Sequence, residues 1–304
     1  MMKMRPNYRL VVAVLSILIS QPATAQQATL VGTVKDKETQ AGIPFCQIMV
    51  GGKNEGTYTD ESGRFSLTTE WATGTTLSFS NIGYRPAERI ISNPSTDSLR
   101  IELTKKYNTL KEVVVKPGKE KNVYIGYKKQ KHVSDCYQKY GEEIALFLKA
   151  DKRKNGWLKQ VYVYITNEGK PDTKFRIHIY TMDSVTHKPF EDITDTNIIV
   201  QDSQGNEWVV ADLSDKHIPM NDGAFVSVEW IEGHCNSAQV LQSTKHTEVS
   251  MLNGQVLGLS RNSWKGKRHI QYMFHRDAFQ KEWGFSFNPI YRPMIYAKVS
   301  YYNP

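Results

Sequence analysis

The sequence has few cysteines and no long apolar run. Its 304 residues include three cysteines, Cys46, Cys136 and Cys235, which lie far apart in the chain. Three cysteines in an exported chain form at most one intramolecular disulfide, so a disulfide-stapled scaffold is excluded. Each of the three pairings stays open, and so does a chain with three free thiols.

A membrane-spanning helix is also missing from the sequence pattern. The run from Leu10 to Ile19 has ten residues, and no second run is longer. A helix needs roughly 20 apolar residues to cross a bilayer. An integral helical membrane protein, with a transmembrane segment in the mature chain, is therefore not expected.

The same short run belongs to a secretory signal peptide pattern. Lys3, Arg5 and Arg9 precede it, and an A-x-A cleavage site, Ala23-Thr24-Ala25, follows it. We expect residues 1–25 to be removed, which leaves 304 − 25 = 279 residues. No cysteine follows the cleavage site, so no lipid anchor is expected there. The predicted localisation is export, to the periplasm or to the outer-membrane face.

Neither sign of charge is in large excess. The formal charge of +8 falls to +5 when the three basic residues of the signal leave. This small excess indicates solubility, and we expect no nucleic-acid partner. A hydrophobic fraction of 39%, with 6 Trp, 16 Tyr and 11 Phe, excludes wholesale disorder. The length predicts two domains.

Residues 26–104 carry short strand patterns separated by turns, and no helical period occurs there. Seven such patterns at regular spacing indicate a small β-sandwich. The predicted strands are Leu30–Val34, Ile43–Val50, Thr57–Thr59, Arg64–Thr68, Thr75–Ser80, Ala87–Ile91 and Leu99–Leu103.

The rest of the chain divides into a basic stretch and a second strand-rich region. Residues 105–141 are predicted to be a Lys-rich linker with one embedded strand, Leu110–Val115. An electrostatic contact with anionic polymer or lipid head groups is the alternative for this stretch. Residues 142–304 show nine or ten further strand patterns, which predict a second, larger, jelly-roll-like sandwich. A short helical turn is considered only for Asp277 to Trp283.

Four motifs stand out in the first region: Gly32-Thr33-Val34, Gly42-Ile43-Pro44, Gly56 to Phe65 and Leu77 to Tyr84. Together they resemble the carboxypeptidase regulatory-like domain of Bacteroidetes envelope proteins. The pattern of that family is G-x-V, then G-x-P, then G-T-x-T-D-x-x-G-x-F, then L-x-F-S-x-I-G-Y. The resemblance covers Ala28 to Leu103 and implies a seven-stranded transthyretin-like sandwich.

The resemblance also implies a relation to TonB-dependent outer-membrane receptors. This domain often precedes their plug, followed by a segment similar to Leu110–Val115. A plug and a barrel do not fit in the roughly 165 residues that remain, because each barrel strand takes about 9–11 residues. The second region resembles the sandwich paired with this domain in short exported proteins, a resemblance that implies no chemistry. The residues that carry it are Phe175 to Tyr180, Trp208 to Ser214 and Gly223 to Ile231.

No established catalytic motif is present, and we expect no enzyme, no cofactor and no metal. A zinc carboxypeptidase needs His-x-x-Glu, which is absent; His187 and Glu191 are one residue too far apart. Gly258 to Asn262 begins like a nucleophile elbow but lacks its last glycine. Adjacent residues on a strand face opposite ways, which argues against pairing of His234 with Cys235.

Two weaker hypotheses for the second region stay open. Glu229 and Asp212 would serve a glycoside hydrolase if they flanked one bond, although such carboxylates more often bond turns and neighbouring backbone. The scattered histidines would hold a metal if they converged, although a solvated surface role is favoured. His178 alternates with apolar residues, so it is predicted to point outward or to a second layer.

The aromatic residues suggest a ligand surface. Trp157, Trp264 and Trp283 lie near turns and are the candidates for stacking on sugar rings, whereas Trp208 and Trp230 border apolar runs typical of a core. The predicted function is a non-catalytic envelope protein with a binding or scaffold role. The expected partner is a glycan or an envelope protein, the latter through strand addition at exposed sheet edges. Alternatives are a glycoside hydrolase and a purely structural protein, and the oligomeric state stays open.

Overall fold

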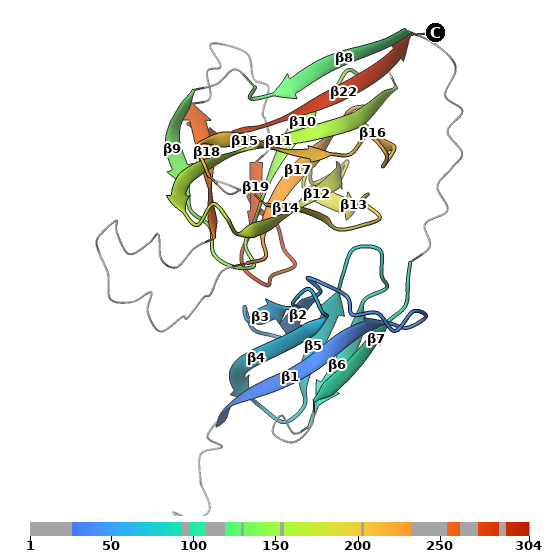
Figure 1. Ribbon diagram of the computed structural model, residues 1–304, viewed down its shortest axis with the longest axis vertical. Helices are drawn as coiled ribbons and strands as arrows, with labels where there is room; N and C mark the ends of the chain where they lie inside the picture. The colour runs from blue at the N-terminus through green and yellow to red at the C-terminus, as the bar shows by residue number, and fades with distance from the viewer. Residues whose placement is uncertain are drawn as a thin grey trace, which may run out of the picture.

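The described chain is built from β-strands. The computed structural model describes residues 26–92, 98–106, 119–128, 131–152, 155–201, 204–232, 254–261, 273–285 and 290–303. Within them, 22 strands form four sheets and no helix occurs (Figure 1). Over these same ranges, nothing helical is long and apolar enough to cross a membrane. The predicted all-β fold is confirmed.

Residues 26–106, here the N-terminal module, contain all seven predicted strands. One sheet has the order β4-β1-β7 and the other β3-β2-β5-β6, at the bottom of Figure 1. The strands are β1 (Gln26–Asp36), β2 (Gln47–Val50), β3 (Gly56–Tyr58), β4 (Arg64–Trp71), β5 (Thr75–Ser80), β6 (Ala87–Ile91) and β7 (Leu99–Leu103).

The core of this module follows from the period of two. In β4 every second side chain is buried, beginning with Phe65, because successive residues of a strand face opposite sides. Phe65 packs against Phe79 of the other sheet with ring centroids 6.0 Å apart. Tyr84 is partly buried against the same core, and its hydroxyl donates to Asp36 at 2.9 Å.

Residues 119–303, here the C-terminal module, form two larger sheets packed face to face. The seven-stranded sheet runs β13-β12-β17-β10-β19-β20, with β14 paired to β12. Its strands are β10 (Glu143–Lys149), β12 (Lys174–Met182), β13 (Pro189–Asp192), β14 (Ile198–Gln201), β17 (Gly223–Trp230), β19 (Met273–Arg276) and β20 (Gly284–Phe285).

The eight-stranded sheet runs β21-β18-β11-β22-β8, with β15 and β16 paired to β11 and β9 paired to β18. The main core lies between the two sheets, with Trp230 as its largest fully buried side chain. Its strands are β8 (Lys119–Gly126), β9 (His132–Cys136), β11 (Gly156–Gly169), β15 (Glu207–Asp212), β16 (Ile218–Pro219), β18 (Gln255–Arg261), β21 (Tyr291–Pro293) and β22 (Ile295–Asn303).

Part of the stretch predicted to be a linker is strand. β8 pairs with β22 along its whole length, and β9 pairs with β18. Val123 and Ile125 of β8 pack against the core, whereas Lys121, two residues before Val123 on the same face, is exposed. The lysine content hid this strand, because only two apolar side chains mark its inner face. The embedded strand Leu110–Val115 lies outside the described residues, as do residues 1–25 and Cys235.

Two further sequence expectations can be compared with the structure. The helical turn considered for Asp277 to Trp283 is wrong: this segment is a turn in which Phe279 has a φ of 56°. Cys46 and Cys136 are both free thiols. Burial raises the pKa of Cys46 to about 12 and that of Cys136 to about 11, so both stay protonated at neutral pH.

A glycine pair tests how the turn before β4 stabilises the N-terminal module. Gly63 has a φ of 78°, and a Cβ there would lie 2.5 Å from the carbonyl oxygen of Val34. Gly74 has a φ of 86° and open space around it. We expect Gly74→Ala to cost about 1–2 kcal/mol of backbone strain. Gly63→Ala should cost about 1–3 kcal/mol more because the chain must also move apart.

Urea unfolding followed by tryptophan fluorescence measures both variants, since Trp71 lies in this core. Equal losses of unfolding free energy in Gly63→Ala and Gly74→Ala would show that the close approach at Gly63 contributes nothing.

Candidate functional site

The outer face of the seven-stranded sheet carries a row of four charged side chains. Arg276, Glu143, Glu229 and Arg176 occupy paired positions on the neighbouring strands β19, β10, β17 and β12. The residues beside them in sequence, such as Val228, belong to the inner core, so the charged side chains point the other way. We refer to these four residues as the charged row.

The charged row is buried and internally paired. Glu143 is 0% exposed and Glu229 2% exposed. Arg276 donates to Glu143, which also accepts the hydroxyl proton of Ser227. Arg176 lies 3.3 Å from Glu229. Two glutamates directly opposite each other repel, so the flanking arginines are what make this arrangement possible.

His178 joins a third acid to the charged row. Its Nδ1 lies 2.6 Å from Asp192 of β13, and its Nε2 lies 3.0 Å from Glu229. Both partners are acceptors, so both ring nitrogens donate and the ring is an imidazolium. Burial alone would lower the pKa of His178, but the charge of Glu143 and the bonds to Asp192 and Glu229 raise it to about 10.

These six residues, the charged row with His178 and Asp192, form one ion network. It contains three carboxylates, two guanidinium groups and one imidazolium, so its charges balance only while His178 is protonated. Burial would raise the pKa of Glu229, but Arg176 and the bond from His178 hold it well below its ordinary value. Buried charges of this kind are stable only when each one is paired and hydrogen-bonded.

The N-terminal module completes the ion network. The hydroxyl of Tyr58, on β3, donates to Glu229 at 2.7 Å, and the amide of Gln47 donates to the same oxygen at 3.3 Å. Arg176 donates to the carbonyl oxygen of Phe45. Burial and the charge of Glu229 raise the pKa of Tyr58 well above its ordinary value, so this hydroxyl stays a donor.

Three aromatic rings pack beside the network where the modules meet. Tyr58 lies 5.2 Å from Tyr140 and 5.7 Å from Phe279, measured between ring centroids. The hydroxyl of Tyr140 accepts the backbone N–H of Tyr58 at 2.9 Å. Phe45 and Phe279, both in this junction, have φ values of 54° and 56°. A phenylalanine rarely adopts this conformation, so the contacts of the junction must compensate for the strain.

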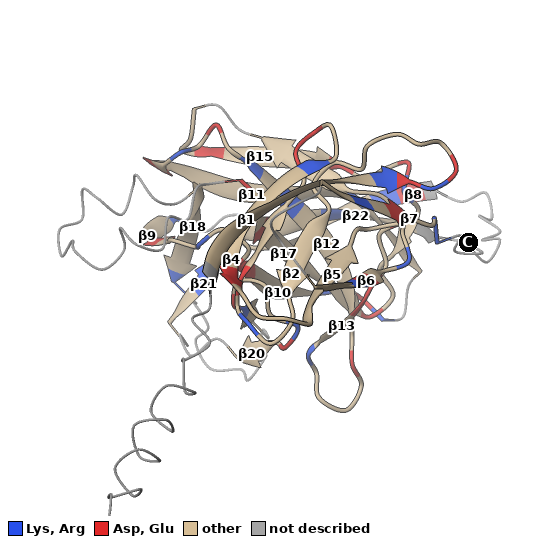
Figure 2. Ribbon diagram, turned by 90° about the horizontal axis from the view of Figure 1, so that it is seen from below, with Lys and Arg blue, Asp and Glu red and all other residues tan. Residues whose placement is uncertain are grey.

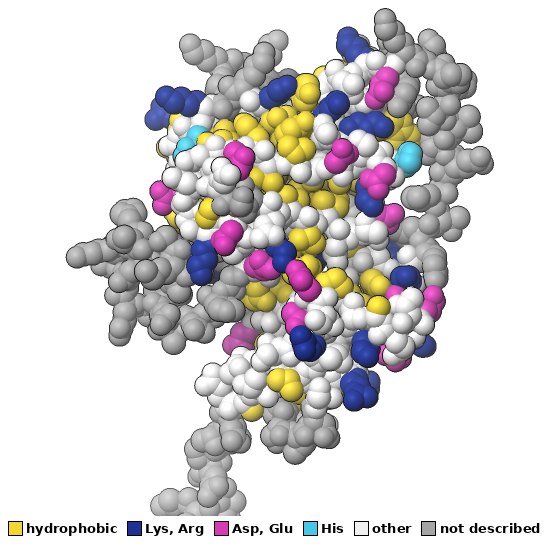
Figure 3. All heavy atoms as spheres, viewed as in Figure 1, with side chains coloured by type: hydrophobic (Ala, Val, Ile, Leu, Met, Phe, Trp, Pro, Cys, Tyr) yellow, Lys and Arg dark blue, Asp and Glu magenta, His cyan; other side chains and the backbone are white. Residues whose placement is uncertain are grey.

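Polar pairs surround the buried junction. Lys174 lies 2.6 Å from Glu61 of the N-terminal module and 3.4 Å from Glu232 of its own module. The amide of Asn197 donates to Asn81 at 3.1 Å. Figure 3 shows charged side chains of both signs gathered where the modules meet. This surface has an apolar and ionic centre with a polar rim, the anatomy of a stable interface.

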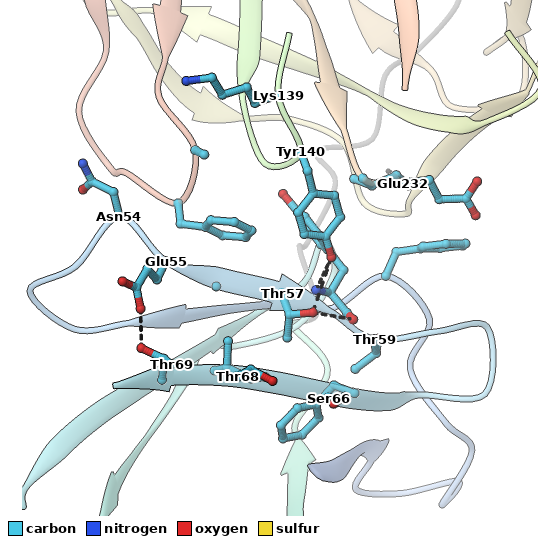
Figure 4. A pocket seen from close by; sticks show the side chains of 18 of the residues that line it. Asn54, Glu55, Thr57, Thr59, Ser66, Thr68, Thr69, Lys139, Tyr140 and Glu232 are labelled. Atoms are coloured by element: carbon cyan, nitrogen blue, oxygen red, sulfur yellow. Dashed lines mark hydrogen bonds between the residues drawn. The ribbon is translucent and has the colours of Figure 1, made fainter. Parts of the chain in front are cut away.

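A cleft of about 1270 Å³ opens beside the junction (Figure 4). Side chains of β3 and β4, including Thr57, Ser66 and Thr68, line one side of it. Lys139 and Tyr140 line the other side, from the C-terminal module. The cleft therefore exists only because the two modules are held in this relative position.

The ion network also contains the strongest geometric candidate for a metal site. One donor atom each of Glu143, His178 and Glu229 lies within 4.8 Å of the others. A metal needs an unprotonated ring nitrogen, yet both nitrogens of His178 donate to carboxylates. Arg176 and Arg276 already supply the positive charge. The residues do not fit a metal centre, and the cluster is better described as an ion network.

Two of the three tryptophans predicted to form a ligand surface are buried in the structure. Trp157 is 9% exposed and packs against His217, and Trp283 is 8% exposed and packs against Tyr180. Neither ring offers a flat face to solvent. Trp264 lies outside the described residues. Trp230 is a core residue as predicted, whereas Trp208 is half-buried on an outer sheet face.

A different set of aromatic side chains gathers on the outer face of the eight-stranded sheet. Tyr162 and Tyr296 stack with centroids 4.2 Å apart, Trp208 lies 4.7 Å from Tyr296, and Tyr124 is exposed. Figure 3 shows hydrophobic side chains over β11, β15 and β22. These rings come from four strands, so no local pattern in the sequence marked them.

Asp212 and Glu229 do not form a pair. Glu229 points from the outer face of the seven-stranded sheet, and Asp212 lies on β15 of the other sheet, next to the core residue Ala211. Each therefore faces away from the inter-sheet core, on opposite sides of the sandwich. Asp212 is exposed and accepts the backbone N–H of Ser214, the turn contact expected of such a carboxylate. These two carboxylates do not flank one substrate bond.

Alternation correctly predicted the direction of the His178 side chain, which points to a second layer. Glu229 was singled out only as a possible catalytic acid, and the other four members of the ion network were not identified. Ser227 and Glu229 alternate with apolar residues in β17, which reads as a solvent face. The only available signal was the unusual number of charged side chains opposite one apolar face, and that signal alone does not reveal a covering module.

Comparison with known proteins identifies the N-terminal module. Residues 30–115 match the CarboxypepD_reg-like domain family, which confirms the resemblance at that level and reaches 11 residues beyond the predicted boundary at 104. No curated protein matches the chain. One solved chain, from "Structure of infectious bursal disease virus Gx strain", is 9% identical over 92% of this chain and 66% of that chain. Its TM-score is 0.19, so this likeness carries no argument.

The ion network predicts an alkaline loss of stability. The pKa of His178 is about 10 in the folded protein and about 6.5 when unfolded, so its stabilising charge is fully present below pH 6.5 and disappears as the pH approaches 10. His178→Gln removes this titration. Urea unfolding of both proteins between pH 6 and 10 should show a falling difference in stability. A constant difference across this range would contradict the assignment of an imidazolium.

The bond from Tyr58 predicts that one hydroxyl stabilises the junction. Tyr58→Phe keeps the ring but removes a hydrogen bond to the buried Glu229, and we expect a loss of about 1.5–3 kcal/mol. The matched control is Tyr124→Phe, at an exposed ring of the C-terminal module, which should change stability by less than about 0.5 kcal/mol. Equal effects of the two substitutions, measured by urea unfolding, would contradict the role of Tyr58.

Proposed function

We propose that this is an exported, non-catalytic binding or scaffold protein of the cell envelope, in which the two modules form one recognition cleft. The observation that carries the proposal is the contact of Tyr58 and Gln47 with Glu229. Through it the CarboxypepD_reg-like module completes a buried ion network of its partner module. A module attached in this way has a fixed position, and a fixed cleft binds a ligand with less loss of entropy than a hinged one.

The bonding of the titratable groups favours binding over catalysis. A general acid or base must reach the proton of a substrate, within about 3 Å. Each carboxylate of the ion network, and its imidazole, bonds to another protein group. These four groups belong to His178, Asp192, Glu143 and Glu229. Glu142, which lines the cleft, accepts the backbone N–H of Lys139. The proposal therefore assigns these groups to structure and the cleft to recognition.

The cellular setting is part of the same proposal. The signal pattern of residues 1–25 supports export. The motifs of the N-terminal module resemble those of Bacteroidetes envelope proteins, where the domain often precedes TonB-dependent receptors. We therefore infer a place in the periplasm or at the outer-membrane face, with an envelope protein or a glycan as partner.

Site-specific photo-crosslinking in intact cells tests the binding role. A photoreactive residue at Asn54, exposed and on the rim of the cleft, is expected to form a product with an envelope component. The control position is Val185, which is 83% exposed and outside the cleft. A glycan array with the purified protein covers sugar ligands. No product specific to Asn54 together with a blank array would refute the proposal.

A further inference from the structure

The cleft is acidic although the protein is basic. The formal charge of the whole chain is +8, and charged residues of both signs are interspersed along its described loops and strand ends (Figure 2). Six carboxylates but only two cationic side chains line the cleft. Lys53 and Lys174, which do not line the cleft, pair with Glu55 and Glu232. An acidic excess remains, so a cationic ligand is favoured there. The carboxylates belong to Glu55, Asp60, Glu70, Glu142, Glu232 and Asp277, and the cations to Arg64 and Lys139.

One wall of the cleft is the free edge of a strand. β4 pairs with β1 on one side and ends its sheet on the other. Every residue from Arg64 to Glu70 lines the cleft. Successive side chains of a strand point to alternate sides of the sheet. An unbroken run of lining residues therefore means that the cleft follows the backbone edge of β4.

The alternation of the ladder shows which backbone groups face the cleft. The N–H of Val34 donates to the carbonyl of Gly63 at 2.7 Å, which sets the phase of pairing between β1 and β4. Residues two and four positions further, Phe65 and Leu67, therefore bond to β1. The N–H and C=O groups of Ser66 and Thr68 then point away from β1. Among the described residues, none forms a hydrogen bond to these groups.

This edge is open only at its centre, because Asp60 bonds the cleft-facing groups of Arg64 and Lys53 donates to the carbonyl of Glu70. β4 is eight residues long and pairs without a register shift, and its centre, Ser66 to Thr69, has no charge and no proline. Natural edges are usually blocked by charges, proline or bulges. On β3, at the other side of the cleft, Tyr140 already accepts the free N–H of Tyr58. As far as the chain is described, the C-terminal module thus bonds to the β3 edge and leaves the centre of the β4 edge open.

We propose that the cleft binds an extended, lysine- or arginine-rich segment of a partner protein, which adds as a strand to β4 at Ser66 and Thr68. This rests on the proposed function, since it names the partner class of the same cleft. Up to four main-chain hydrogen bonds are available at these two residues, and such bonds give affinity without sequence preference. The surrounding carboxylates select for cationic side chains and speed the encounter.

A set of peptides tests the proposal on the unaltered protein. The probe is a fluorescent hexapeptide in which lysine alternates with threonine or valine, and its affinity is measured by anisotropy. We expect it to bind at least tenfold more tightly than the peptide with glutamate in place of lysine. N-methylation of alternate amides, which removes donors but keeps the charge, should weaken binding at least tenfold. Raising the salt concentration should weaken binding as well.

A matched pair of variants tests the strand edge from the protein side. Thr68→Pro removes an N–H that faces the cleft and not β1, so the sheet keeps its ladder. It is expected to weaken binding of the basic peptide at least tenfold, whereas Thr68→Val keeps the N–H and should stay within threefold. Unfolding curves of both variants show whether the fold is retained, and the N-methylated peptide gives the same test without any substitution.

The outcomes separate this inference from the proposed function. Equal binding of the basic and the acidic peptide, or full binding of the N-methylated peptide, would overturn strand addition by a basic segment. Binding of maltohexaose or an array glycan in the cleft, without peptide binding, would overturn it too but leave a recognition cleft. A partner that still crosslinks at Asn54 in the Thr68→Pro variant would likewise overturn strand addition and leave a recognition cleft.

Discussion

The carboxylate of Glu229 is the group on which the architecture depends. It is buried, it lies opposite a second glutamate, and it bonds to Arg176, His178, Tyr58 and Gln47. A buried charge without partners costs several kcal/mol, so each of these bonds must persist. Two of the partners belong to the N-terminal module. The position of that module is therefore a condition for the stability of the other.

This constraint also explains why the seven-stranded sheet is buried on both faces. An antiparallel sheet commonly packs one face on the core and leaves the other to solvent. Here β10 and β17 are buried at nearly every residue. Beyond the charged row, the same outer face carries Phe147, Phe225 and Tyr180, which form a separate aromatic cluster. One end of the face is thus ionic and covered by the N-terminal module, and the other is apolar.

The cleft follows from the way the two modules meet. The C-terminal module contacts the β3 edge through Tyr140 and packs Phe279 against Gly56, where a Cβ would lie 2.5 Å from that ring. None of its described residues bonds to the backbone edge of β4, which belongs to the other sheet of the N-terminal module. The gap between the covered edge and the free edge is the cleft, and its acidic lining contrasts with the basic chain around it.

The local sequence specifies the strands of the N-terminal module, because alternation and turn glycines are local properties of the backbone. Ala87–Ile91 and Leu99–Leu103 were predicted with the observed bounds, and His178 was placed on the correct side of its strand. It did not predict β8 among the lysines, nor the burial of the polar face of β17. The contact of Tyr58 with Glu229, 171 residues away in the chain, arises only in the folded protein. That contact depends on how two folded modules dock, and no local period encodes the docking of one surface on another.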